Sequence, residues 1–149
     1  MNEYIVLCAQ VLIIFCLVVL GWKYLKGYYP GSSYVIEDPP ITKNGLEPEQ
    51  AKFMFFYTTW CPWSRLAKEK WSSFKQLMKN NPGKYGKYTL LFEDIDCEAN
   101  KGKAALYSVN AYPTFKLITS EKTYVMQGTP DPKTFDLFLT AVLGQKSSS

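Results

Sequence analysis

The sequence predicts an α/β domain, a mixed central sheet covered by helices, preceded by a single transmembrane helix. An uncharged apolar run at the start of the chain is long enough to cross a bilayer. A second apolar run, Phe53 to Thr58, has the pattern of a strand buried on both faces. Strand-like and helix-like segments then alternate, which predicts parallel strands with crossover helices, and a late hairpin adds antiparallel strands.

Composition narrows the function classes. A chain of 149 residues has room for one domain and an appendage. The net charge is +4, and the basic residues are scattered among acidic ones, so we expect no nucleic-acid partner. Because the chain contains no histidine, Ser-His and Cys-His catalytic pairs and His-ligated zinc are excluded for this chain alone. We expect neither a metal nor a cofactor.

The apolar segment from Tyr4 to Trp22 carries one polar side chain, Gln10. Aromatic residues flank it, as expected at headgroup depth; they are Tyr4, Trp22, Tyr24, Tyr28 and Tyr29. A cleaved signal peptide is the alternative, with Val19 and Gly21 at a small-residue cleavage site. The long apolar run and the lack of a basic segment before it favour a membrane anchor, with the lipid bilayer as a partner.

Charge around the span bears on orientation. Lys23 and Lys26 follow the span, while Glu3 and the terminal amine precede it. The positive-inside rule therefore favours the C-terminal domain of a single-pass protein on the cytoplasmic side. The endoplasmic reticulum and a viral membrane are the two membranes that we consider, and the charges do not distinguish them. Cys8 and Cys16 fall inside the span, where cysteine behaves as a small apolar residue.

We expect five regions along the chain. Turn-forming residues after the span indicate a linker, with one short apolar stretch from Tyr34 to Ile36 that can add a strand. The regions are a flank (1–3), the transmembrane helix with its interface (4–26), a Pro/Gly-rich linker (27–46), the α/β domain (47–143) and a disordered tail (144–149).

Within the domain, turn residues and apolar spacing predict the order strand, helix, strand, helix, hairpin, helix. Pro62 and Pro132 each suit the first turn of a helix, and Asp131 is a helix cap. The expected elements are strands at 53–58 and 88–95, a helix from Pro62 that ends at 80–83, a short helix at 104–109, hairpin strands at 114–119 and 122–127, and a last helix through Val142.

Four segments carry a resemblance to a known family: FFYTTWCPWSRLA, FEDIDCEAN, VNAYPTF and YVMQGTPDPKTFDLFL. In order and spacing they resemble the thioredoxin superfamily, and within it the protein disulfide isomerase branch, over residues 47–143. The resemblance implies a thioredoxin-like fold with the Trp-Cys pair at a strand-to-helix turn. It also implies that Pro113 is a cis proline facing the thiol.

In such proteins a thiolate forms at a helix N-terminus, where unpaired N–H groups and the helix dipole lower the thiol pKa. Cys61 matches that position and is the candidate nucleophile. Arg65 keeps the basic residue that follows the motif. The resemblance further implies that Trp60 shields the thiol and that Trp60, Trp63, Tyr112 and Pro113 contact a bound substrate.

Three residues depart from the family's pattern. Ser64 replaces the resolving cysteine, so a two-thiol redox cycle is excluded. Phe55 stands where family members keep a buried carboxylate, and Trp63 stands where the isomerase branch has a histidine. The motif is therefore a monothiol variant with a degraded site, and at most a weak exchange or isomerase activity is expected.

Other residues near the motif have simpler interpretations. Cys97 is expected to be a small buried filler, with a resolving or cross-linking role as the alternative. Trp71 and Phe74 are expected in the core. Trp63 and Tyr112, which flank the motif and the proline, are expected at the surface.

Two functions remain open. The first is a structural, adaptor or client-holding module at a membrane, which binds protein partners through the thioredoxin-like surface. By architecture it resembles the thioredoxin-like proteins of large DNA viruses, and so includes a component of the virion. The alternative is a monothiol thiol-disulfide exchange or isomerase enzyme that uses Cys61.

Overall fold

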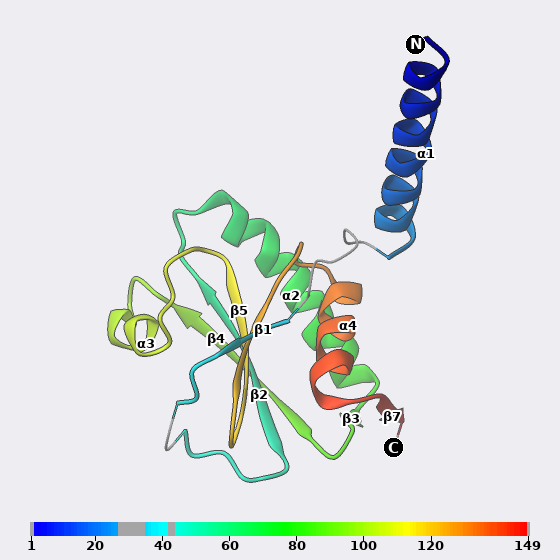
Figure 1. Ribbon diagram of the computed structural model, residues 1–149. Coiled ribbons are helices and arrows are strands. Elements are labelled where there is room, and N and C mark those ends of the chain that lie inside the picture. Colours follow the sequence, from blue (N-terminus) through cyan, green and yellow to red (C-terminus); the bar gives the residue numbers. More distant parts are fainter. Residues whose placement is uncertain (1, 27–34, 42–43, 149) are drawn as a thin grey trace. The chain divides into compact units, whose positions relative to one another are not determined.

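The computed structural model describes residues 2–26, 35–41 and 44–148 of the 149. The chain divides into two units, residues 1–33 and 34–149. The first contains α1, Asn2–Lys26, a single long helix (Figure 1). From Glu3 to Tyr24 it is long and apolar enough to cross a membrane, and a signal sequence would pass the same test. The predicted interfacial residues Tyr28 and Tyr29 lie outside the described residues.

The second unit is built on a five-stranded mixed sheet in the order β1-β6-β5-β2-β4. β2 is parallel to β4 and antiparallel to β5, and β6 is antiparallel to both β5 and β1. The sheet confirms the predicted α/β class and the hairpin. Its strands are β1 (Val35–Asp38), β2 (Gln50–Tyr57), β4 (Thr89–Asp96), β5 (Thr114–Thr119) and β6 (Thr123–Met126).

β2 separates two hydrophobic clusters, which explains its continuous apolar sequence. Phe53 and Phe55 point into the larger cluster with residues of α2 (Pro62–Asn80) and α4 (Pro132–Leu143). Met54 and Phe56 point to the other face, where the short helix α3 (Lys101–Leu106) packs. Trp71 and Phe74 of α2 are buried in the larger cluster, as predicted. The expected helices and strands are present, with ends that differ by a few residues.

A small second sheet was not predicted. β3 (Gly83–Tyr85) pairs with β7 (Lys146–Ser148), so the segment that we expected to be a disordered tail carries a strand. The pairing brings backbones very close, since a Cβ added at Gly83 would lie 2.4 Å from the carbonyl oxygen of Ser147. Tyr85 is buried and donates a 2.5 Å hydrogen bond to Asp136 on α4. Gly83 allows the close approach of β7, and the buried Tyr85 fixes β3 to α4. Together they explain why the polar segment Lys146–Ser148 forms a strand.

β1 lies within the predicted linker and belongs to the sheet. The strand expected from Tyr34 to Ile36 is found at Val35–Asp38, while Tyr34 lies outside the described residues. Its last residue, Asp38, accepts a hydrogen bond from the buried ammonium of Lys116, which also donates to the Tyr107 carbonyl at 2.6 Å. A charge pair thus fastens the edge strand to β5 and to the loop after α3.

Candidate functional site

Cys61 lies where the chain passes from β2 to α2. It is the N-cap residue of α2, with extended backbone angles (φ −80°, ψ 118°), and Pro62 follows it in the first turn. The Arg65 N–H donates to the Cys61 carbonyl at 3.2 Å, which closes the first turn of the helix. The first N–H groups of a helix have no partner within it. The thiol of Cys61 therefore begins the helix next to unpaired backbone donors.

A residue that follows the end of β4 holds the turn before Cys61 in place. The backbone N–H and the hydroxyl of Thr59 both donate to one carboxylate oxygen of Glu98, at 2.9 and 2.5 Å. The N–H of Glu98 in turn donates to the Asp96 carboxylate at 3.0 Å. Glu98 was not among the predicted site residues, because its partner is 39 positions away in the sequence. It positions the turn that carries the cysteine.

The thiol of Cys61 faces the loop before β5. Its sulfur donates to the Tyr112 carbonyl at a distance of 3.6 Å, and the residue is only 6% exposed. The peptide bond between Tyr112 and Pro113 is cis, as predicted. The ring of Trp60 meets the ring of Tyr112 edge-on, with centroids 6.3 Å apart. The structure thus brings together Cys61, Trp60, Tyr112 and Pro113.

Local hydrogen bonds lower the pKa of the Cys61 thiol below its ordinary value. The largest cause is the backbone N–H of Ser64; burial opposes it, and the Ser64 hydroxyl and the Trp63 N–H add to the lowering. The positive charge of Arg65 has a smaller effect in the same direction. Hydrogen bonds to the charged form favour that form, so the site stabilises a thiolate, the nucleophilic state of cysteine.

Ser64 faces inward on the first turn of α2. It is 1% exposed, and its hydroxyl oxygen accepts a long hydrogen bond, 3.4 Å, from the Thr58 N–H. The hydroxyl of Thr58 is buried and has no hydrogen-bond partner among the described residues. A serine hydroxyl cannot attack a disulfide to release a bound partner. The residue at the resolving position thus stabilises the Cys61 thiolate and leaves it without a second thiol.

Phe55 is fully buried, so no carboxylate occupies this position beneath the turn. Its ring stacks on Phe115 with centroids 4.8 Å apart. The register neighbour on β4, Asp94, accepts hydrogen bonds from Trp71 and Lys75 at 2.5 and 2.7 Å. The Asp94 carboxylate therefore holds α2 against β4, the strand at the edge of the sheet.

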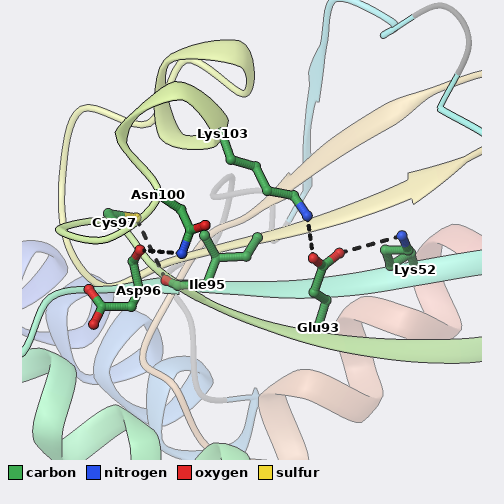
Figure 2. Close-up of polar contacts among 7 residues, drawn as sticks. All are labelled: Lys52, Glu93, Ile95, Asp96, Cys97, Asn100 and Lys103. Atoms are coloured by element: carbon green, nitrogen blue, oxygen red, sulfur yellow. Dashed lines mark hydrogen bonds and ion pairs between the residues drawn. The ribbon is translucent and has the colours of Figure 1, made fainter.

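Cys97 is a buried free thiol, as the filler interpretation predicts. Its sulfur donates to the Ile95 carbonyl at 3.7 Å (Figure 2), and the Tyr112 side chain hydrogen-bonds to it. Burial raises the pKa of Cys97, which is the opposite direction from Cys61. Burial likewise raises the pKa of the Tyr112 phenol, followed by the charge of Cys97 and the hydrogen bond to it. Tyr112 therefore contacts one thiol through its backbone and the other through its side chain.

A groove of about 500 Å³ lies beside Cys61. Trp63 and Leu66, which are 70% and 57% exposed, line it, together with Tyr112 and Pro113. Gly128, Thr129 and Pro130 also line it, as do the charged residues Glu69 and Lys70. Trp63 is at the surface as predicted, whereas Tyr112 is partly buried because its side chain packs against the smaller hydrophobic cluster. Arg65 is exposed on α2. In the described part of the chain, no cluster of three or more His, Cys, Asp or Glu residues is arranged to hold a metal.

Known structures share the fold of this domain. Human ERp44 is 19% identical with a TM-score of 0.53 over 63% of this chain, which spans only 28% of the ERp44 chain. The first thioredoxin domain of mouse protein disulfide-isomerase A4 is 18% identical with a TM-score of 0.53, covering 64% of each chain. Thioredoxin from Fasciola hepatica is 22% identical with a TM-score of 0.50, covering 62% of this chain and 81% of that one. At these identities the likeness concerns the fold alone.

No curated protein matches the chain. The family match is direct, because the sequence fits the thioredoxin family over residues 43–140, about two thirds of its length. That range contains the β2–α2 turn with Cys61, the cis proline and most of the sheet. The chain belongs to the thioredoxin family.

Proposed function

We propose that this protein holds client proteins at a membrane through mixed disulfides with Cys61. The observation that carries the proposal is the pairing of a thiol whose pKa is lowered with a serine at the resolving position. The first property favours formation of a mixed disulfide, and the second removes the internal route for its release.

The proposed reaction is one thiol-disulfide exchange. The Cys61 thiolate attacks a disulfide of the client, and a new bond forms between the Cys61 sulfur and one client sulfur. The other client sulfur leaves as a thiolate and takes up a proton from solvent. No oxidant is consumed, because one disulfide replaces another. The complex then persists until an external thiol attacks it.

The groove beside Cys61 supports binding of an extended client segment. Trp63 and Leu66 present exposed apolar surface there, which is a common feature of protein interaction sites. The carbonyl of Tyr112 already accepts a hydrogen bond from the Cys61 thiol, and it becomes free to accept one from a client once the sulfur is bonded. The apolar helix α1, retained as an anchor, would keep the complex at a membrane.

Two other functions differ from this one in what Cys61 does. In an exchange enzyme, a small thiol such as glutathione would release the client rapidly, so Cys61 would turn over. In a purely structural or adaptor role, including one in a viral particle, partner binding would not need the thiol. The lowered pKa of Cys61 favours a function that uses it.

The test is capture of clients by the full chain in cells, followed by rapid alkylation and non-reducing electrophoresis. We expect bands above the monomer that disappear on reduction and are absent from Cys61→Ala. Cys97→Ala is the matched control, since it removes a buried thiol whose pKa is raised, and its bands should remain. Equal bands from Cys61→Ala would exclude the proposal. Unchanged partner binding by Cys61→Ala, with no bands in the wild type, would support the structural role.

A further inference from the structure

The helix α2 turns one continuous face toward the groove beside Cys61. The groove is lined by Trp63, Leu66, Ala67 and Lys70. These four residues are spaced i, i+3, i+4 and i+7, so they share one face of the helix. Most of the apolar surface of Trp63 and Leu66 is open to solvent. The groove therefore continues for about two turns of helix beyond the thiol.

Lys70 brings a positive charge to this face. In the part of the chain that the structure describes, Lys70 takes part in no ion pair. Glu69 also lines the groove, but six residues separate it from Trp63, which places it about 60° beyond the edge of the shared face. The charge that the face itself offers to a bound chain is therefore positive, and it attracts a carboxylate.

The groove is continuous with the place where a mixed disulfide forms. Tyr112 and Pro113 line it, and the Tyr112 carbonyl oxygen lies 3.6 Å from the Cys61 sulfur. The groove volume of about 500 Å³ is in the range of pockets that hold small ligands. It therefore suits a short extended segment next to the client cysteine rather than a folded domain.

The spacing along α2 matches that of an extended chain. A helical residue advances by about 1.5 Å, so Leu66 lies about 7.5 Å and Lys70 about 13.5 Å beyond Cys61 along the helix axis. An extended chain advances by about 3.3 Å per residue, and every second side chain points to the same side. The second residue from the client cysteine is therefore level with Leu66, and the fourth is level with Lys70.

We propose that this face of α2 selects client segments with a bulky apolar residue two positions from the reacting cysteine and an acidic residue four positions from it. The inference rests on the proposed function, because it concerns a client that reacts with Cys61. The apolar residue packs on Leu66 and the Trp63 ring, and the carboxylate pairs with Lys70. Residues at the first and third positions point away from the face and are free to vary.

The test uses capped peptides that are symmetric about one cysteine, so that either direction of binding presents the same residues. The preferred peptide is Asp-Ser-Leu-Ser-Cys-Ser-Leu-Ser-Asp, with its cysteine joined to thionitrobenzoate by a disulfide. Attack of the Cys61 thiolate on the peptide sulfur forms the mixed disulfide and releases the thionitrobenzoate anion, whose absorbance gives the rate.

The protein is the full chain in detergent micelles, with Cys8 and Cys16 changed to serine. Each rate is divided by the rate of the same peptide with mercaptoethanol, which cancels the reactivity of the peptide itself. Cys61→Ala gives the background rate.

Moving each leucine from the second to the third position should slow the reaction about tenfold, since the apolar side chain then points to solvent. Replacing both aspartates with serine should slow it about threefold, since an exposed ion pair is lost. Leu66→Ser should remove the preference for the leucine position, and Lys70→Gln should remove the preference for aspartate.

Lys68→Gln is the matched control, because it removes the same charge from another exposed face of α2, where the ammonium lies over the Tyr57 ring. It should keep both preferences. Equal rates for the two leucine arrangements overturn the proposal, and so does an aspartate preference that Lys70→Gln and Lys68→Gln reduce equally. A failure of the proposed function is distinct from these results, because no peptide would then react faster with the wild-type Cys61 than with Cys61→Ala.

Discussion

The Cys61 sulfur lies 3.6 Å from the carbonyl oxygen of Tyr112, 51 residues later in the chain. This contact joins the N-terminus of α2 to the loop before β5, and it places the thiol against a backbone group that is otherwise available for a bound peptide. Ser64 donates hydrogen bonds to the same thiol through its backbone N–H and its hydroxyl. The site is therefore organised around one nucleophile, and its predicted behaviour depends on the residues that contact it.

Ser64→Ala should raise the pKa of Cys61, because the variant loses the hydroxyl donor but keeps the backbone N–H, which has the larger effect. The pH dependence of iodoacetamide labelling should move upward. The free energy of unfolding of the variant should also be lower by about 1 kcal/mol, since the Thr58 N–H loses its acceptor. Ser72→Ala, on the exposed side of α2, should change neither quantity. An unchanged labelling profile would show that the hydroxyl does not act on the thiol.

Ser64→Cys should restore an internal resolving thiol. Mixed disulfides of Cys61 should then dissociate within the time that the wild-type complexes persist, because the new thiolate attacks the Cys61 sulfur and the client leaves. Pulse-chase labelling followed by non-reducing electrophoresis measures the lifetime of the complexes. Ser72→Cys adds an exposed thiol two turns further along α2 and should leave the lifetime unchanged. Equal lifetimes for the wild type and Ser64→Cys would contradict the role given to Ser64.

Asp38→Ala should destabilise the domain by about 2 kcal/mol. Removing one partner of a buried ion pair leaves the other charge uncompensated, and Lys116 is 4% exposed. This cost is lower than for a fully buried pair because the Asp38 side chain is 29% exposed, and solvent screens its charge. Lys116→Met should stay within about 1 kcal/mol of the wild type, since it removes the charge and keeps the volume. Urea unfolding in detergent distinguishes the two, and an equal loss in both variants would show that packing alone fastens β1.

Asp131→Ala should lower the free energy of unfolding by about 1 kcal/mol. The carboxylate of Asp131 accepts a hydrogen bond from the Lys133 N–H at 3.0 Å and so caps α4. Asp131→Asn keeps an acceptor at the cap and should retain most of the stability. The same urea experiment measures both variants. If Asn lost as much stability as Ala, the charge rather than the hydrogen bond would be responsible.

Local sequence patterns predicted the fold well where they reflect burial. The run from Phe53 to Thr58 predicted a strand covered on both sides, and β2 contributes to both hydrophobic clusters. Pro62 and Pro132 marked the starts of α2 and α4. β7 escaped prediction because its residues are polar and are held by backbone pairing with β3, which no periodicity records.

The functional site likewise contains residues that local sequence motifs predict and contacts that they do not. Cys61, Trp60 and Pro113 could be placed from the family's motifs, and the structure brings them together around Tyr112. The bonds from Thr59 to Glu98 and from Tyr112 to Cys97 could not be predicted. They join residues far apart in sequence, and each depends on side-chain directions that only the assembled sheet determines.

The most direct test of the central claim compares the two buried thiols within one wild-type chain. Labelling of Cys61 and Cys97 by iodoacetamide can be followed separately by mass spectrometry of their peptides across a range of pH. We expect the Cys61 profile to have its midpoint below the ordinary cysteine value of about 8.5, because local donors stabilise its thiolate, and Cys97 to label only at higher pH. A Cys61 midpoint at or above the ordinary value, or one that matches Cys97, would contradict a client-holding thiol at this site.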